Sequence, residues 1–172
     1  MTTEATSERV TVDLHVRSLT PRAGHGRQEV VIERLERLAD TGQIHEFSVQ
    51  LWGRQVSLST AAARTDAGQN VLDRVEQFRD WAADTDRSIS SFFETRRISS
   101  EMTEESYVAL VLPMFTLAEY HDDDLAYVAP CSDGDGVCTV TDRLDTLEHE
   151  SVVTKTLEAD GDGRPIAEEA EE

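Results

Sequence analysis

The sequence predicts an α+β fold of the ferredoxin-like βαββαβ kind, with a winged-helix-like arrangement as the alternative and a small β-rich annex after it. Apolar and polar residues alternate over residues 10–17 and 44–58, which is typical of strands with one buried face. Helical periodicity flanks the second segment, over residues 27–41 and 66–83. With a fourth strand over residues 88–98, both helices are expected on one face of a four-stranded antiparallel sheet.

The first strand and helix have regular patterns. Residues 10–17 place four apolar side chains on one side of the strand and Thr, Asp, His and Arg on the other. Val31, Leu35 and Leu38 recur at i, i+4 and i+7, so they form one apolar stripe. Gly42 follows the helix, and glycine is the residue most often found just past a helix C-terminus.

Residues 44–58 are predicted to form a β-hairpin. Its apolar side chains occupy alternate positions before and after the reversal at Gly53-Arg54, namely Phe47, Val49, Leu51, Val56 and Leu58. A glycine at the reversal can adopt the positive φ that a tight turn requires. The hairpin would supply the two middle strands in chain order.

The second helix is expected to begin at Thr65-Asp66, because both residues can cap a helix N-terminus. Val71, Val75, Phe78 and Ala82 form its apolar stripe. Residues 88–98 are rich in β-formers and are predicted as the last strand of the domain.

The chain is predicted to divide at residue 98. Residues 9–98 form the α+β domain, and residues 99–148 form the β-rich annex with a short helix that Thr141-Asp142 caps and that carries Leu144 and Leu147. Residues 1–8 and the acidic tail 149–172 are predicted to be disordered, because they contain few apolar side chains.

The charge is strongly acidic and unevenly distributed. The net charge is −19, and Lys155 is the only lysine. This balance favours a protein from a cytoplasm of very high salt, where the Debye length is a few ångströms and self-repulsion is screened. Residues 99–172 contain 20 acidic and 3 basic side chains, whereas residues 1–98 contain 15 and 13. An anionic partner would therefore meet the N-terminal part.

The sequence predicts a soluble, cytoplasmic protein without a disulfide. The first ten residues are polar, so they do not resemble a signal or transit peptide. The longest apolar stretch, residues 107–118, is interrupted by Pro113 and is too short to span a bilayer. Cys131 and Cys138 are predicted to be packed thiols at the two ends of a hairpin turn.

Catalytic and metal-binding patterns are weak, so the sequence predicts a non-enzymatic protein with no cofactor and no metal. The five His residues are scattered, and neither a Gly-x-Ser-x-Gly elbow nor a phosphate-binding glycine loop occurs. Asp133-Gly134-Asp135-Gly136 and the similar segment 160–163 look like calcium loops but lack required oxygen ligands. Turns in an acidic protein explain them better.

Nucleic-acid binding has two possible forms. The open face of the predicted sheet would present His15, Arg17, Ser48, Gln50, Trp52 and Gln55, with Arg97 as a further candidate. Only Trp52 could stack on an RNA base, so coverage of this face by the annex or a second subunit is favoured over RNA binding. A helix-turn-helix over residues 30–51 would need a recognition helix where residues 43–49 alternate like a strand. A winged variant could use the Gly53-Arg54 hairpin.

Several segments resemble a group of small haloarchaeal proteins labelled as helix-turn-helix domain proteins. The similar segments are VTVDLHVRSL, VIERLERLADTGQIHEFSVQLWGRQV, AARTDAG, FFETR and LAEY followed by LAYVAPCSDG. The similarity covers roughly residues 9–148. It implies transcriptional regulation without naming a target, and it transfers no site residue.

These observations predict a non-enzymatic cytoplasmic regulator that associates with DNA and can form a homodimer. The candidate phosphate contacts are Arg17, Arg54, Arg96 and Arg97, which lie at predicted strand ends and turns in the nearly neutral part. The alternative is an α+β module that binds a protein or a small ligand through its open sheet face and does not bind nucleic acid.

Overall fold

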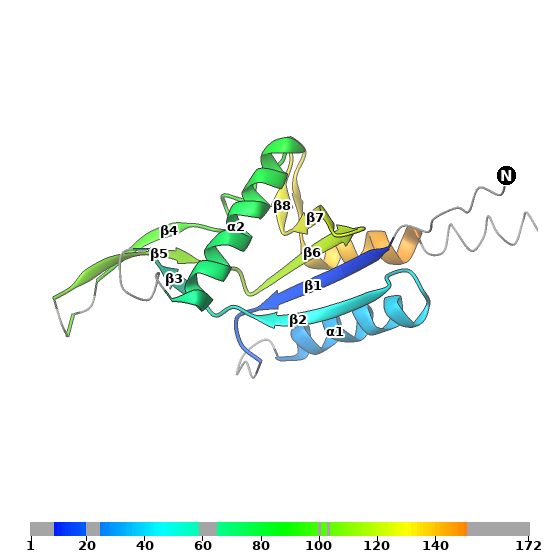
Figure 1. Ribbon diagram of the computed structural model, residues 1–172, viewed down its shortest axis with the longest axis horizontal. Coiled ribbons are helices and arrows are strands. Elements are labelled where there is room, and N and C mark those ends of the chain that lie inside the picture. The colour runs from blue at the N-terminus through cyan, green and yellow to red at the C-terminus, as the bar shows by residue number, and fades with distance from the viewer. Residues whose placement is uncertain (1–8, 20–24, 59–64, 100, 103, 151–172) are drawn as a thin grey trace, which may run out of the picture.

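The centre of the fold is a four-stranded sheet in the order β2-β1-β6-β7, seen in the computed structural model (Figure 1). The structure describes residues 9–19, 25–58, 65–99, 101–102 and 104–150. β1 (Val10–Val16) pairs in parallel with β2 (Glu46–Leu51) and antiparallel with β6 (Phe115–His121). β6 pairs in turn with β7 (Asp124–Ala129). The predicted disordered segment 1–8 and most of the predicted tail lie outside the described residues, whereas residues 149–150 are helical.

Two helices cover one face of this sheet: α1 (His25–Asp40) and a C-terminal helix over residues 140–150. The side chains that meet there are all buried and come from β1 (Val12, Leu14, Val16), α1 (Val31, Leu35, Leu38) and the C-terminal helix (Leu144, Leu147). Complete burial of such a side chain stabilises the fold by about 1.5–3 kcal/mol. The apolar patterns predicted for these three elements are confirmed.

α2 (Asp66–Asp84) covers the opposite face (Figure 1). Its Val75 and Phe78 pack in one cluster with Ala118 and Val128, whose neighbours Leu117 and Ala129 belong to the cluster on the other side. Adjacent strand residues point to opposite faces, so the molecule has three layers: helices, sheet, helix. The predicted start of α2 is confirmed, because the Thr65 hydroxyl accepts a hydrogen bond of 3.0 Å from the backbone N–H of Gly68.

The predicted hairpin over residues 44–58 is wrong. β2 pairs with β1, while β3 (Gln55–Ser57) joins a different sheet. The chain does bend at Gly53, whose φ is 84°, but the bend leads from the central sheet into the second one. The alternation of apolar and polar residues determines which side chains share a face of a strand. It does not determine which other strand that strand pairs with. The helix between β1 and β2 is the connection that parallel strands require.

The ferredoxin-like arrangement is not found, because α1 and α2 lie on opposite faces and β6 takes the place beside β1. The winged-helix alternative requires helices packed against each other, and here the sheet separates α1 from α2. Strand pairing also crosses the predicted boundary at residue 98, since β6 belongs to the predicted annex. The coarser expectation of a mixed α and β fold is confirmed.

A second, three-stranded sheet projects from the body as an arm (Figure 1). The arm consists of β3, β5 (Ser106–Val111) and β4 (Thr95–Ser99) in the order β3-β5-β4. The predicted strand over residues 88–98 therefore begins only at Thr95. The residues before it form turns and place Ile89 and Phe93 in the core beneath α2.

The C-terminal helix is held to the body by charged side chains. Arg34 of α1 donates to Glu148 at 2.8 Å and also to Asp145. Arg143 donates to the buried carboxylate of Glu119 at 2.8 Å. The helix begins at residue 140, with Thr139 in place of Thr141 as its cap, because Thr139 and Asp142 cap each other reciprocally.

β8 (Cys131–Ser132) and β9 (Val137–Cys138) form a short hairpin before this helix. Cys131 and Cys138 lie opposite each other across it, and both are free thiols, as predicted. Burial raises the pKa of the Cys131 thiol.

Candidate functional site

Two of the four candidate arginines meet where the arm joins the body. Arg17 follows β1, and its guanidinium Nε donates to the Leu112 carbonyl at 2.7 Å. Burial, and next the positive charge of Arg54, lower the pKa of Arg17. The two guanidinium groups repel each other, and an anion bound between them would offset this repulsion. The position therefore favours anion binding. The exposed Arg54 makes no ion pair with any residue that the structure describes.

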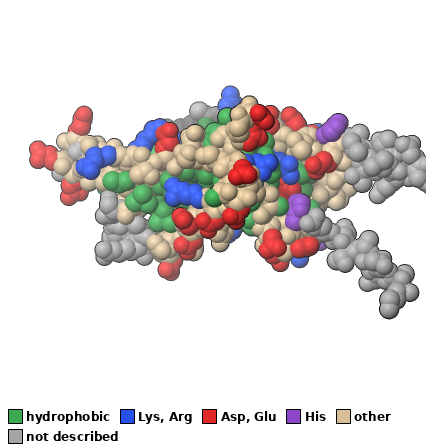
Figure 2. Space-filling model, turned by 90° about the horizontal axis from the view of Figure 1, so that it is seen from above, with side chains coloured by type: hydrophobic (Ala, Val, Ile, Leu, Met, Phe, Trp, Pro, Cys, Tyr) green, Lys and Arg blue, Asp and Glu red, His purple; other side chains and the backbone are tan. Residues whose placement is uncertain are grey.

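The other two candidates lie on the arm and do not join this pair. Arg96 forms an exposed ion pair of 2.8 Å with Glu94. Arg97 is the next residue of β4, so its side chain points to the opposite face. Figure 2 shows acidic side chains at the outer end of the arm and basic ones further in, and the described residues near that end include Glu101, Glu104 and Glu105.

The sheet face that was predicted to be open is covered above β6 and β7. Along the edge strand β2, the same face is accessible to solvent. α2 supplies the cover, so neither the predicted annex nor a second subunit is needed there. At the edge, Ser48 donates to Asp13 at 2.7 Å and Gln50 donates to Ser48 at 3.0 Å. These side chains form a polar strip beside α2.

His15 and Trp52 were expected on the open polar face, and that expectation is wrong. His15 is 5% exposed and Trp52 is 7% exposed. Their rings stack with centroids 4.6 Å apart, and both contact Phe78 of α2. The sequence could not reveal this, because a polar face and a face covered by an aromatic cluster share the same alternation.

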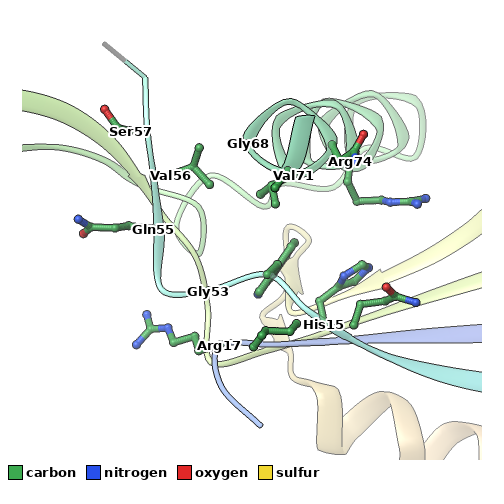
Figure 3. A pocket seen from close by; sticks show the side chains of 14 residues that line it. His15, Arg17, Gly53, Gln55, Val56, Ser57, Gly68, Val71 and Arg74 are labelled. Carbon is green, nitrogen blue, oxygen red and sulfur yellow. The ribbon is translucent and has the colours of Figure 1, made fainter. Parts of the chain in front are cut away.

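A pocket of about 580 Å³ opens next to these two rings (Figure 3). It lies between the ends of β1 and β2, strand β3 and the first half of α2. Its size is in the range of small-molecule sites. Figure 3 shows Val56 and Val71 facing each other across the pocket, while Arg17 and Gln55 point to the other side of the strand.

Two buried polar atoms beside the pocket have no hydrogen-bond partner among the residues that the structure describes: Nε2 of His15 and Nε1 of Trp52. Burial lowers the pKa of His15 to about 4, although the charge of Asp13 opposes the shift. The ring is therefore neutral near pH 7. A buried polar atom without a partner costs about 1–3 kcal/mol, which makes this part of the core unusual.

Arg74 of α2 lines the same pocket and was not singled out in the sequence. It donates to the Tyr120 hydroxyl at 2.7 Å and to Gln77 at 3.4 Å. No carboxylate among the described residues pairs with it. Arg74 lies one helical turn after Asn70 and Val71, which also line the pocket. This helical spacing was the sequence pattern that could have identified Arg74.

The fold and these sites define a three-layer α/β protein with a projecting, arginine-bearing arm and a small-molecule-sized pocket at its base. The chain belongs to the family described as "Helix-turn-helix domain", which matches residues 4–152. No curated protein and no solved structure matches the chain.

The family description and the described structure differ in one respect. A helix-turn-helix joins two helices by a turn of three or four residues. In the part of the chain that the structure describes, residues 41–65 separate α1 from α2 and contain β2 and β3. The described connection between α1 and α2 is therefore not the short turn of a helix-turn-helix.

Across the described ranges there is no group of three or more His, Cys, Asp or Glu side chains that could hold a metal ion. Among the helices of these same ranges, none has the length and apolar character needed to cross a membrane.

Proposed function

We propose that this protein is a DNA-associated transcriptional regulator, non-enzymatic and cytoplasmic, that works as a homodimer in a cell of very high salt. The observation that carries the proposal is membership of the helix-turn-helix domain family over residues 4–152. The strongly acidic composition and the excess of Arg over Lys support the high-salt setting.

The arm and its base are the proposed DNA surface. Arg17 and Arg54 place two positive charges at the base, neither in an ion pair with a residue of the described ranges, and Arg97 adds an exposed side chain on β4. At molar salt the Debye length is about 3 Å, so only direct contacts between guanidinium groups and phosphates contribute. Bidentate arginine geometry suits such contacts.

The acidic end of the arm limits how it could meet DNA. Glu101, Glu104 and Glu105 would repel phosphates if the tip entered a groove. The proposed contact therefore runs along the shaft and base of the arm. Of the four candidate arginines, Arg96 is expected to contribute least to DNA binding, because it already forms an ion pair with Glu94.

The test is genome-wide occupancy in cells, followed by a gel shift of the most occupied fragment in molar KCl. We expect Arg54→Glu to weaken binding about tenfold, which corresponds to the loss of one charge-assisted contact. Arg79→Glu is the matched control, because Arg79 is exposed on α2 and its ion pair with Glu76, at 3.7 Å, is also exposed. Occupancy no higher than background, or equal binding by Arg54→Glu and wild type, would contradict the proposal.

A further inference from the structure

The pocket beside α2 borders the proposed DNA surface, because Arg17 is among its lining residues, but its wall toward α2 has a recognition chemistry of its own. In Figure 3, Arg17 points away from the side on which Val56, Val71 and Arg74 lie. The walls on that side combine apolar side chains with a few polar groups, the usual composition of a small-molecule site. Val56 and Val71 supply apolar surface, and Gln50 and Asn70 supply amides.

The charge of the lining favours an anion. The sequence contains 35 acidic and 16 basic residues, yet none of the lining residues is Asp or Glu. Arg74 is among them, and among the described residues it donates to the neutral groups of Tyr120 and Gln77. A guanidinium bound only to neutral groups keeps its charge available for an incoming carboxylate.

The aromatic floor favours a flat ligand. Trp52 and His15 stack at an interplanar angle of 26°, and Phe93 meets Trp52 edge to face. Both stacked rings are more than nine-tenths buried and carry a polar atom without a partner. The other tryptophan differs, because Nε1 of Trp81 donates to the Ala126 carbonyl at 3.0 Å. Of the two indoles, the one beside the pocket is therefore the one whose N–H has no acceptor in the described part of the chain.

We propose that this pocket binds a small organic anion with a flat apolar body, of which an aromatic carboxylate is the simplest. The carboxylate lies at Arg74, and the ring lies between Val71 of α2, Val56 of β3 and the Trp52 indole. A small shift of Trp52 on binding gives its N–H an acceptor in the ligand or its hydration shell. This site stands whether or not the protein binds DNA.

The test is a titration of the full chain with 2-naphthoate in molar KCl, followed by NMR of the two indole N–H resonances. We expect the Trp52 resonance to shift and the Trp81 resonance to stay in place, since Trp81 is hydrogen-bonded elsewhere. The neutral analogue 2-naphthamide is expected to bind about tenfold more weakly, because it lacks the charge that Arg74 recognises.

Variants on one helix separate recognition from folding. Arg74→Gln is expected to weaken 2-naphthoate binding about tenfold, and Arg79→Gln, outside the pocket, is expected to leave it unchanged. Asn70→Phe places a ring at the pocket wall from an exposed position and is expected to abolish the Trp52 shift, while Glu76→Phe is expected to preserve it. Circular dichroism confirms that each variant is folded.

Two outcomes overturn the inference. One is an unmoved Trp52 resonance at saturating 2-naphthoate in the folded wild type. The other is equal binding of 2-naphthoate and 2-naphthamide together with no effect of Arg74→Gln, which would leave an apolar hollow without anion recognition. Neither outcome bears on DNA binding, so a failure here is distinguishable from a failure of the proposed function.

Discussion

His15 is a neutral side chain held in the core, and its titration links stability to pH. Burial lowers its pKa from 6.5 to about 4. Between these values the unfolded chain binds more protons than the folded one, so stability increases with pH across this window. The contribution of the neutral ring is complete above pH 6.5 and is lost as the pH falls through 4.

We therefore expect His15→Phe to reduce the pH dependence of the free energy of unfolding. From pH 7 to pH 4 the wild type should lose about 3 kcal/mol more than the variant. Denaturant titrations at a series of pH values provide the measurement. His45→Phe is the control, because His45 is exposed. Parallel curves for wild type and His15→Phe would show that the ring is solvated and titrates normally.

Glu119 is a buried carboxylate that joins the sheet to the C-terminal helix. It is 1% exposed and accepts from Arg143 at 2.8 Å, with His121 Nε2 also at 2.8 Å. Glu119→Gln leaves the half-buried guanidinium without its counter-charge, which costs about 3 kcal/mol. The measurement is the denaturant concentration at the midpoint of unfolding, compared between proteins with the same m-value.

The matched control for Glu119 is Glu46→Gln. The ion pair of Glu46 with Arg9 is exposed on both sides, at 63% and 52%, and is expected to contribute less than about 1 kcal/mol. Equal effects of the two substitutions would mean that the Glu119 pair is solvated. At the residue scale the sequence did not reveal Glu119 or Arg74, because a lone charged residue in a predicted element carries no sign of its burial.

At the scale of elements, the hydrophobic periodicity predicted correctly which face of each helix and strand is buried. It predicted incorrectly which strands pair with each other. The stripes of α1 and α2 and the apolar side of β1 all lie in the core. The failure was at Gly53-Arg54, where a hairpin reversal and a change of sheet have the same local signature. Pairing of β1 with β6 joins residues about 100 positions apart, and no local pattern encodes such a contact.

The C-terminal helix offers a test at this scale. Leu144 is fully buried against the sheet face that α1 also covers. Leu144→Ala is expected to destabilise the protein by about 2–5 kcal/mol, the cost of the lost burial and the cavity. Leu51→Ala, at a 58% exposed position, is the control and is expected to cost less than about 1 kcal/mol. Unfolding monitored by circular dichroism distinguishes the two. A near-neutral Leu144→Ala would mean that this helix is not part of the cooperative core.

For the whole molecule, composition gives the sign and the uneven distribution of the charge, whereas it does not predict the shape. The nearly neutral N-terminal part contributes both the arginines at the base of the arm and the pocket wall of α2. The pocket itself could not be predicted, because its lining comes from β1, β2, β3 and α2, and only the three-layer arrangement brings these elements together.

The central claim, DNA association through arginine contacts, is tested most directly by the salt dependence of affinity. Each phosphate contact contributes a slope of about −0.9 in a plot of log K against log salt concentration. With all four candidate arginines engaged, fluorescence anisotropy of the most occupied fragment between 1 and 3 M KCl should give about −3.6, and Arg54→Glu about −2.7. A slope near zero, or binding too weak to measure across this range, would contradict the account.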